Sequence, residues 1–317
     1  MGQFVVSLDF EKFWGIRDHR KIEDYRLNLE RVDSICLKML KLFSEFEIHV
    51  TWATVGFLAF ENKEELLTML PKVKPNYNET NLSPYDYISQ SELEHRFHFS
   101  PNIINAIRHA KNQELASHTF SHYYCLEPGQ TESSFESDLK LNIEVVKKKF
   151  DIEMSSLVFP RNQVKKEYLQ TLAKNNIKSY RGNETNWIYS VKMSFLLKRG
   201  FRLIDSYFNI TGSNTYDLKN IKKEVPYNIP SSCFLRPVKC KNSLFKRLKM
   251  KRIKNQMTYA AKNDRVFHLW WHPHNFGNDI EANILFLKEI LNHFIFLKEK
   301  YNMCSLNMNE ISKKLEV

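Results

Sequence analysis

The sequence predicts a parallel α/β fold, in which short apolar strands alternate with helices along the whole chain. Two observations carry this prediction. Short apolar runs are separated by segments whose apolar residues repeat with a helical period. Polar and titratable side chains directly follow several of these runs, which is typical of parallel folds, whose sites lie at the carboxyl ends of the strands.

The predicted strands are short and rich in apolar residues. In chain order they are residues 4–8, 49–55, 115–117, 157–159, 177–180, 201–204 and 266–271. Gly56 stops the second strand, and Pro273 ends the last one at His272.

Helical periodicity appears between the strands. It predicts helices over residues 23–45, 134–149, 165–175, 243–262 and 280–299. Residues 72–100 are polar, rich in Pro and Asn and weakly periodic, so we expect an irregular excursion there. Because no repeat or linker divides the chain, residues 1–317 are predicted to form a single domain.

The composition is that of a globular protein with one unusual feature, its charge. Of 317 residues, 43% are hydrophobic and 26% charged, which excludes a disordered or collagen-like chain. The formal net charge is +11, which suggests an anionic partner. Nucleic acid is not predicted, because no basic face interleaved with aromatic residues and no recognition motif is present.

Much of the positive charge lies in one segment, residues 236–254, which contains cations and no acid. Interspersed apolar residues predict a basic amphipathic helix that contacts an anionic membrane or a diphosphate-linked sugar carrier. A solvated helix face is the alternative. The cations assigned to this contact are Lys246, Arg247, Lys249, Lys251 and Arg252.

The beginning of the chain and the cysteines predict a cytoplasmic location, with peripheral contact at the inner face of the membrane as an option. Asp9 and Glu11 interrupt the first apolar stretch, and no basic residue precedes it, which is unlike a signal peptide. The five cysteines are scattered and form no CxxC pair, which is typical of reduced thiols.

Two carboxylates and two imidazoles are candidates for a metal site. Asp9 and Glu11 are two residues apart and point to the same side of an extended segment, which suits a metal ligand beside a general base. His118 and His122 are one helical turn apart, so both can face a single metal ion. The alternatives are a solvated loop for the acids and surface histidines for the pair.

Two further strand ends carry reactive side chains. Arg161 can hold a carboxylate in a fixed orientation, although a surface arginine in a turn is the alternative. His272, surrounded by aromatic residues, has the environment of a general acid in a sugar-binding cleft. His268 is interpreted as a core histidine, and about 13 Å of extended chain separates it from His272, too far for the two to share a metal ion.

These residues, in this order, resemble the polysaccharide deacetylase family, carbohydrate esterase family 4. The resemblance covers residues 4–275, and the segment ELASHTFSH at 114–122 is its most specific part. The other matching segments are SLDFE at 7–11, TWATVG at 51–56, FPR at 159–161 and LWWH at 269–272.

The resemblance implies a deformed (β/α) barrel of about seven parallel strands and a divalent metal ion, most often Zn²⁺. It implies hydrolysis of an N-acyl group, most often N-acetyl, on an amino sugar, here during surface polysaccharide biosynthesis. Carried over to this chain, the metal ligands are Glu11, His118 and His122. Asp9 is the base, His272 the acid and Arg161 the residue that orients Asp9, and a sugar stacks on Trp187, Trp270 or Trp271.

The chain also departs from the family pattern, and several alternatives stay open. The two acids are separated by Phe10, so Asp9 and Glu11 could exchange roles. The fourth family motif has two candidates, residues 181–184 and Asp205. The alternative functions are a deformylase, a cyclic-amide hydrolase with the same metal centre, and a sugar-binding relative without catalysis. The N-acylated sugar substrate could be linked to a nucleotide or a lipid diphosphate.

Overall fold

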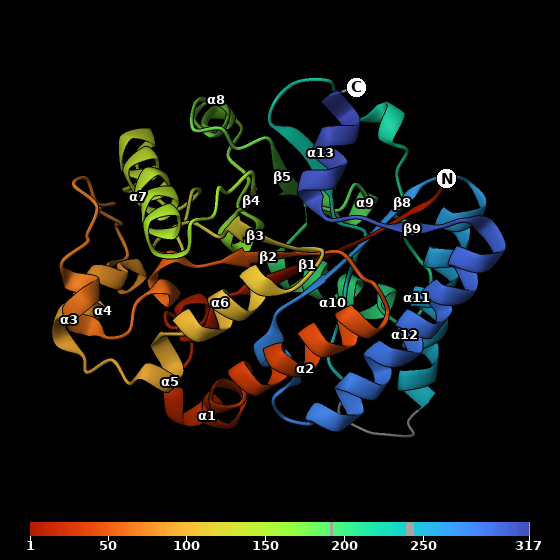
Figure 1. The fold of residues 1–317 in the computed structure, drawn as a ribbon, viewed down its shortest axis with the longest axis horizontal. Helices are drawn as coiled ribbons and strands as arrows, with labels where there is room; N and C mark the ends of the chain where they lie inside the picture. The colour runs from red at the N-terminus through yellow and green to blue at the C-terminus, as the bar shows by residue number, and fades with distance from the viewer. Residues whose placement is uncertain (191–192, 239–243, 317) are drawn as a thin grey trace.

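A parallel sheet forms the centre of the molecule (Figure 1). The computed structural model describes residues 1–190, 193–238 and 244–316. Eight strands lie in the order β6-β5-β4-β3-β2-β1-β8-β7, and β9 pairs with β1. Their bounds are β1 Gln3–Phe10, β2 Val50–Thr54, β3 Gln113–Ser117, β4 Ser156–Val158, β5 Ser179–Gly182, β6 Tyr227–Pro230, β7 Cys233–Phe234, β8 Val266–Trp271 and β9 Cys304–Ser305.

The sheet closes into a deformed barrel because one extended segment pairs with both of its edges. β6 and β7 stand at opposite ends of the strand order, yet only Ser231 and Ser232 separate them in the chain. The Ser231 N–H bonds to Gly182 O at the end of β5, and the Ser232 N–H bonds to His268 O in β8. The predicted (β/α) barrel of parallel strands is therefore confirmed, with β6 and β7 acting as one bent strand.

Helices surround the barrel (Figure 1). Those of more than one short turn are α1 Ile22–Glu30, α2 Val32–Glu45, α4 Pro84–Gln90, α6 Pro101–His109, α7 Glu132–Phe150, α8 Leu169–Lys174, α10 Phe195–Asp205, α11 Leu244–Lys262, α12 Ile280–Tyr301 and α13 Met308–Glu316. The shorter α-helices are α3 Lys63–Leu67, α5 His95–His98 and α9 Trp187–Ser190. The 3₁₀ turns are η1 Lys12–Gly15, η2 Gly56–Ala59, η3 Thr80–Leu82, η4 Pro160–Asn162, η5 Lys166–Tyr168, η6 Leu218–Asn220 and η7 Pro273–Phe276.

Alternation along the strands separates an outer apolar layer from the interior of the barrel. In β1, Phe4, Val6, Leu8 and Phe10 belong to the large core cluster shared with the surrounding helices. The intervening residues point to the other side, toward the barrel axis. The interior becomes polar toward the carboxyl ends of the strands, which is where Asp9 lies.

The amino-terminal end of the barrel is closed by α13. Met308, Ile311 and Leu315 pack against a second apolar cluster that includes Val5 and Ile229. Because α13 covers this end, the carboxyl end of the barrel is the one that is open for a site.

Three predicted elements differ from the structure. The predicted strand at 201–204 is wrong, since these residues lie in α10, whose start is capped by the Ser194 side chain accepting the Leu197 N–H. The predicted helix at 23–45 is divided at Arg31 into α1 and α2. The segment 72–100 contains η3, α4 and α5, and Tyr85 and Ile88 within it are buried against the main core.

Only part of the basic segment is available for the exposed cationic face that its composition predicted. In α11, Lys249 is buried and donates hydrogen bonds to the carbonyls of Arg236 and Pro237, while buried Arg252 pairs with Asp205. Lys246 pairs with Glu289, and Arg247 and Lys251 are exposed. Lys239 and Lys241, also in this segment, lie outside the described residues. None of the described helices combines the length and apolar character needed to cross a membrane.

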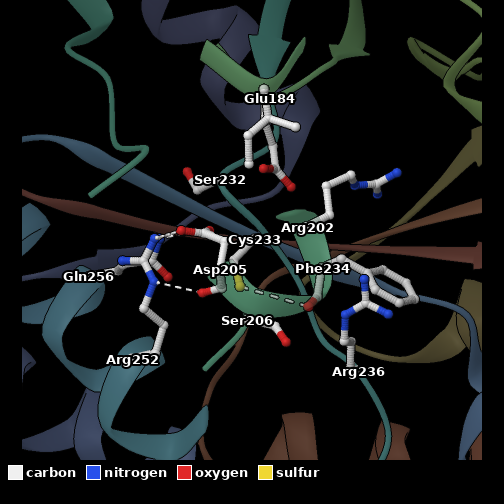
Figure 2. A pocket seen from close by; sticks show the side chains of 11 residues that line it. Glu184, Arg202, Asp205, Ser206, Ser232, Cys233, Phe234, Arg236, Arg252 and Gln256 are labelled. Carbon is white, nitrogen blue, oxygen red and sulfur yellow. Dashed lines mark hydrogen bonds and ion pairs between the residues drawn. The ribbon is translucent and has the colours of Figure 1, made fainter. Parts of the chain in front are cut away.

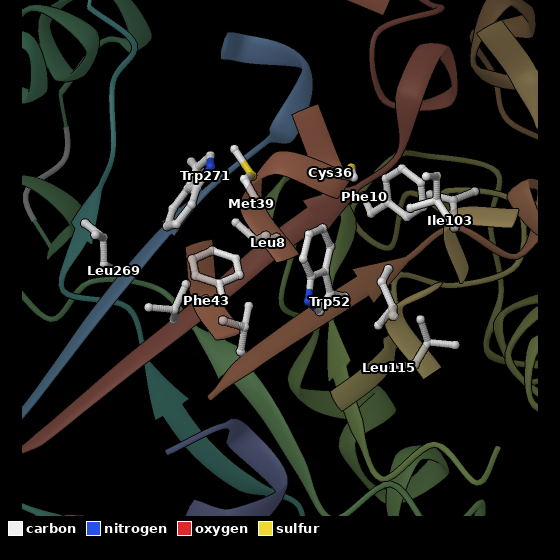
Figure 3. Close-up of a cluster of buried hydrophobic side chains, with 14 of the residues drawn as sticks. Leu8, Phe10, Cys36, Met39, Phe43, Trp52, Ile103, Leu115, Leu269 and Trp271 are labelled. Carbon is white, nitrogen blue, oxygen red and sulfur yellow. The ribbon is translucent and has the colours of Figure 1, made fainter. Parts of the chain in front are cut away.

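Trp271 belongs to the outer core and not to a sugar-binding surface, so its predicted role is wrong (Figure 3). Its side chain is fully buried, and its indole stacks on Phe276 and packs beside Phe43. The alternation of β8 explains this position, since Leu269 and Trp271 face the helices while His268 and Trp270 face the interior.

Replacing Trp271 by alanine should therefore destabilise the fold. We expect Trp271→Ala to lower the free energy of unfolding by about 3–5 kcal/mol, since it leaves a large cavity in the core. Urea unfolding measures this change. Leu285→Ala, at a half-exposed position of α12, is the control and should stay within about 0.5 kcal/mol of the parent. A loss below about 1 kcal/mol for Trp271→Ala would contradict the packing described.

Candidate metal centre and active site

The titratable side chains meet at the carboxyl end of the barrel, around a cavity of about 620 Å³. Asp9 is the second-last residue of β1, and Glu11 directly follows this strand. His118 follows β3, and His272 follows β8. The cavity is lined by Asp9, Glu11, Gly15, Ile16, His19, Arg20, Tyr25, His122, Arg161, Asn162, Ile188, Lys198, Arg199, Arg202, Phe234, Arg236, Pro237, Trp270, His272, His274 and Asn275.

The segment between His118 and His122 is a bent loop and not the helical turn that its spacing predicted. Thr119 and His122 both adopt positive φ angles, 61° and 57°, which turn the chain back on itself. The two rings nevertheless converge, with centroids 5.1 Å apart. The prediction that both imidazoles face one point is therefore confirmed, while the local structure that achieves it was wrong.

Side chains of α7 hold this loop in place. The Asp138 carboxylate accepts hydrogen bonds from the Phe120 and Ser121 N–H groups and from the Ser121 hydroxyl. One turn further along α7, the Asn142 amide donates to Ser117 Oγ at 2.8 Å. Asp138 and Asn142 are four residues apart, so they lie on the same face of α7, and both are buried.

Glu11 stands between the two imidazoles. Its Oε2 lies 3.2 Å from His118 Nε2 and 3.1 Å from His122 Nε2, and all three residues are buried. Burial by itself would raise the pKa of Glu11, but the nearby His272 charge and the hydrogen bonds of His118 and His122 hold that pKa well below its ordinary value. Glu11 is therefore ionised at neutral pH.

The tautomer of His118 makes this cluster a fit for a cation. His118 Nδ1 lies 2.8 Å from Val158 O, which only accepts, so Nδ1 carries a proton, and in the neutral ring Nε2 has the lone pair. That lone pair faces a carboxylate oxygen, and two buried acceptors at this distance require positive charge between them. Burial also lowers the pKa of His122 and keeps its ring neutral, the form that binds metal. Two imidazoles and one carboxylate are a ligand set typical of zinc.

Gly15 leaves room for the Glu11 carboxylate. A Cβ atom at position 15 would overlap the carboxyl carbon and oxygens of Glu11. The 3₁₀ turn η1 therefore passes close beneath the candidate ligand, and glycine is required there for steric reasons.

A second pair of imidazoles approaches the other oxygen of Glu11. His272 Nε2 and His274 Nε2 lie 3.6 Å and 3.7 Å from Glu11 Oε1, so these residues form a second group with the geometry of a cation site. We had placed only His272 at the mouth of the barrel. His118 and His122 lie nearer to Glu11 and are both buried, whereas the His272 side chain is 22% exposed and faces the cavity.

Asp9 is held by Arg181 and not by Arg161. Arg181, on β5, donates from Nη1 to Asp9 Oδ1 at 2.6 Å and from Nη2 to Asp9 Oδ2 at 2.7 Å. Burial raises the pKa of the Asp9 carboxyl, but the charge and hydrogen bonds of Arg181 outweigh it and lower that pKa from its ordinary value. Arg181 falls in the segment that we had considered for the fourth family motif.

The role predicted for Arg161 is accordingly wrong. Its guanidinium pairs with Asp18 and lies 4.4 Å from the ring centroid of Tyr124. Arg161 still lines the cavity, but another carboxylate satisfies its charge. Arg161 adopts a positive φ of 55° within η4.

Arg181 is also fixed from below, by side chains of the barrel interior. Its Nη1 donates to Ser7 Oγ at 3.0 Å, and Ser7 Oγ is in turn 2.8 Å from His268 Nε2. The guanidinium carbon lies 4.1 Å from the ring centroid of Trp270. The interpretation of His268 as a core histidine agrees with its burial and with its pKa, which burial and the Arg181 charge lower to about 3.

The structure separates the two remaining tryptophan candidates. Trp270 lines the cavity but is only 5% exposed, and Arg181 and Phe234 cover its ring. Trp187, on α9, is 41% exposed and is not among the described residues that line the cavity. Phe234, which the sequence reasoning missed, presents an aromatic ring to the cavity instead.

Comparison with solved structures places this arrangement in a known fold. A protein of Mycobacterium smegmatis, provisionally assigned as a polysaccharide deacetylase, superposes with a TM-score of 0.62 and 13% sequence identity, over 99% of this chain and 90% of that one. Puue allantoinase superposes with a TM-score of 0.54 at 10% identity, covering 98% and 89%. A branching enzyme of Pyrococcus horikoshii reaches 0.51 at 12% identity, covering 98% and 69%.

The chain therefore has the fold of the polysaccharide deacetylases. No protein-family model matches the sequence, and no curated protein matches it either. At these identities the structural likeness establishes the fold alone, and the activity has to be argued from the site.

Loss of any ligand of the Glu11–His118–His122 cluster should abolish tight metal binding. We expect Glu11→Gln, His118→Gln or His122→Gln to weaken Zn²⁺ binding more than ~100-fold, because even changes behind the ligands cost 10–100-fold. Calorimetric titration of Zn²⁺ into the metal-stripped protein measures this. His109→Gln, at an exposed position of α6, is the control. If His274→Gln abolished binding and His118→Gln did not, the cation would belong to the second group.

Proposed function

We propose that this protein is a metal-dependent hydrolase that removes an N-acyl group, most often acetyl, from an amino sugar during assembly of a surface polysaccharide. The observation that carries the proposal is the side-by-side placement of two carboxylates with different partners. Glu11 faces imidazoles and suits a cation, while Asp9 is paired with Arg181 and suits a base. This difference supports separate roles for the two acids, which the sequence left interchangeable.

A divalent cation bound by Glu11, His118 and His122 would polarise the acyl carbonyl and acidify a water molecule. Asp9 lies beside these ligands at the cavity wall and can accept the proton of the attacking water. Arg181 keeps Asp9 ionised and fixes its orientation through two hydrogen bonds, so the base is ready at neutral pH.

His272 is placed to return the proton to the leaving nitrogen. The Asn275 side-chain amide lies 3.3 Å from His272 Nδ1, so Nε2 is the ring nitrogen that faces the site. That nitrogen lies 3.6 Å from Asp9 Oδ2 and 3.6 Å from Glu11 Oε1. Water adds to the acyl carbon, the C–N bond breaks, and protonation of the nitrogen gives a free amine and a carboxylic acid.

Asp9→Asn should remove most of the activity and leave metal binding unchanged. We expect kcat for acetate release from N-acetylated amino sugars to fall about 100- to 10,000-fold, since a positioned base contributes that much. Mass spectrometry of the products distinguishes loss of acetyl from loss of formyl or opening of a cyclic amide. If the zinc-loaded parent protein turned over none of these substrates, that result would favour the non-catalytic sugar-binding alternative.

Removal of Arg181 should shift the pH dependence of activity in a defined direction. In the parent protein the Arg181 charge lowers the pKa of Asp9, whereas burial alone would raise it. In Arg181→Met the base therefore stays protonated to higher pH, and the acid limb of kcat/KM should move up by about 1–3 pH units.

Two companion variants make this test specific. Arg181→Lys keeps a positive charge and should shift the acid limb less than Arg181→Met. Arg161→Met should leave the limb where it is, because Arg161 pairs with Asp18. An equal shift in Arg161→Met and Arg181→Met would contradict the assignment of Arg181 as the residue that positions Asp9.

A further inference from the structure

One wall of the cavity is strongly cationic. Lys198, Arg199 and Arg202 come from α10, and Arg236 follows β7. The two acids that line the same cavity already have partners, since Asp9 is bound by Arg181 and Glu11 faces the histidines. The positive charge of this wall is therefore not balanced by the acids of the site.

Three of these cations also have no acid paired with them among the described residues. No carboxylate of the described residues forms an ion pair with Lys198, Arg199 or Arg236. Arg236 is half-buried, and both its burial and the nearby Arg202 charge lower its pKa. Two like charges held near each other at the edge of a cavity favour an anion between them.

An adjoining pocket shows where the neighbouring acids lie (Figure 2). It shares Arg202, Phe234 and Arg236 with the main cavity. Asp205 lies on its other side and is turned toward Arg252, which pairs with it at 3.2 Å. Glu184 also lines this pocket, and burial raises its pKa to about 7, so it offsets at most one of the four cations.

We propose that the substrate carries a phosphate or diphosphate group, which Arg199, Arg202 and Arg236 bind while the acyl group lies at Glu11 and Asp9. Guanidinium groups match phosphate oxygens in geometry and charge, and several of them suit a diphosphate, which carries more than one negative charge. This inference rests on the proposed amino-sugar hydrolase and adds the class of carrier. It places the anion-binding cations at the cavity, and not along α11 as the sequence suggested.

Both a nucleotide and a lipid can supply the diphosphate. The helix α10 also exposes large apolar residues beside its cations, including Leu196, Leu197, Leu203 and Ile204. A lipid-linked sugar could therefore place its chain along this helix, whereas a nucleotide would leave it exposed. The two sources share the diphosphate and are separated by experiment.

Binding to the metal-free protein tests the proposal without requiring turnover. The probes are N-acetylglucosamine, its 1-phosphate, UDP-N-acetylglucosamine and a short-chain isoprenyl diphosphate N-acetylglucosamine, titrated calorimetrically. We expect at least one diphosphate-linked sugar to bind at least about tenfold more tightly than the free sugar. If only the UDP-linked sugar or only the isoprenyl-linked sugar binds more tightly than the free sugar, that result identifies the carrier. If both bind equally tightly, the preference is for the diphosphate itself.

Matched double variants locate the effect. Arg199→Gln/Arg236→Gln should reduce the preference for the diphosphate-linked sugar below about threefold. Arg247→Gln/Lys251→Gln removes the same charge from exposed positions of α11 and should keep the preference. No preference in the parent protein, or a preference that survives Arg199→Gln/Arg236→Gln, would overturn the proposal. Acetate release from a neutral sugar would still support the hydrolase in that case.

Discussion

The buried ion pair between Arg181 and Asp9 is the interaction on which the interior of this barrel depends. Both residues are almost inaccessible to water, so each charge would be very costly without the other. The two parallel hydrogen bonds, together with Ser7, Asn162 and the face of Trp270, satisfy most of the guanidinium. The pair also fixes β5 relative to β1, although 172 residues separate Arg181 from Asp9 in the chain.

Glu11 has the complementary role at the same end of the barrel. Its two oxygens face two pairs of imidazoles, one pair following β3 and the other following β8. A carboxylate surrounded by imidazoles attracts a cation, whereas the charge of a carboxylate clamped by a guanidinium is already compensated. Two acids that are only two residues apart thus receive different chemistry from their partners.

The distribution of charge follows the same logic. The net charge of +11 pointed to an anionic partner, and the composition alone placed the contact with this partner in residues 236–254. In the folded chain, Lys249 and Arg252 are used internally, because a backbone turn and Asp205 lie against α11. The cations that remain directed at the cavity come largely from α10, a segment whose apolar residues predicted a strand.

The sequence by itself determined the alternation of strands and helices and the position of His118, His122, Asp9, Glu11 and His272 at strand ends. These are local properties, since apolar periodicity and turn residues act over a few positions. Only the tertiary structure decided which arginine meets Asp9, because that choice depends on a contact across the barrel. The choice between Trp270 and Trp271 needed both sequence and structure. Strand alternation places the two side chains on opposite faces of β8, but only the packing shows which face belongs to the core.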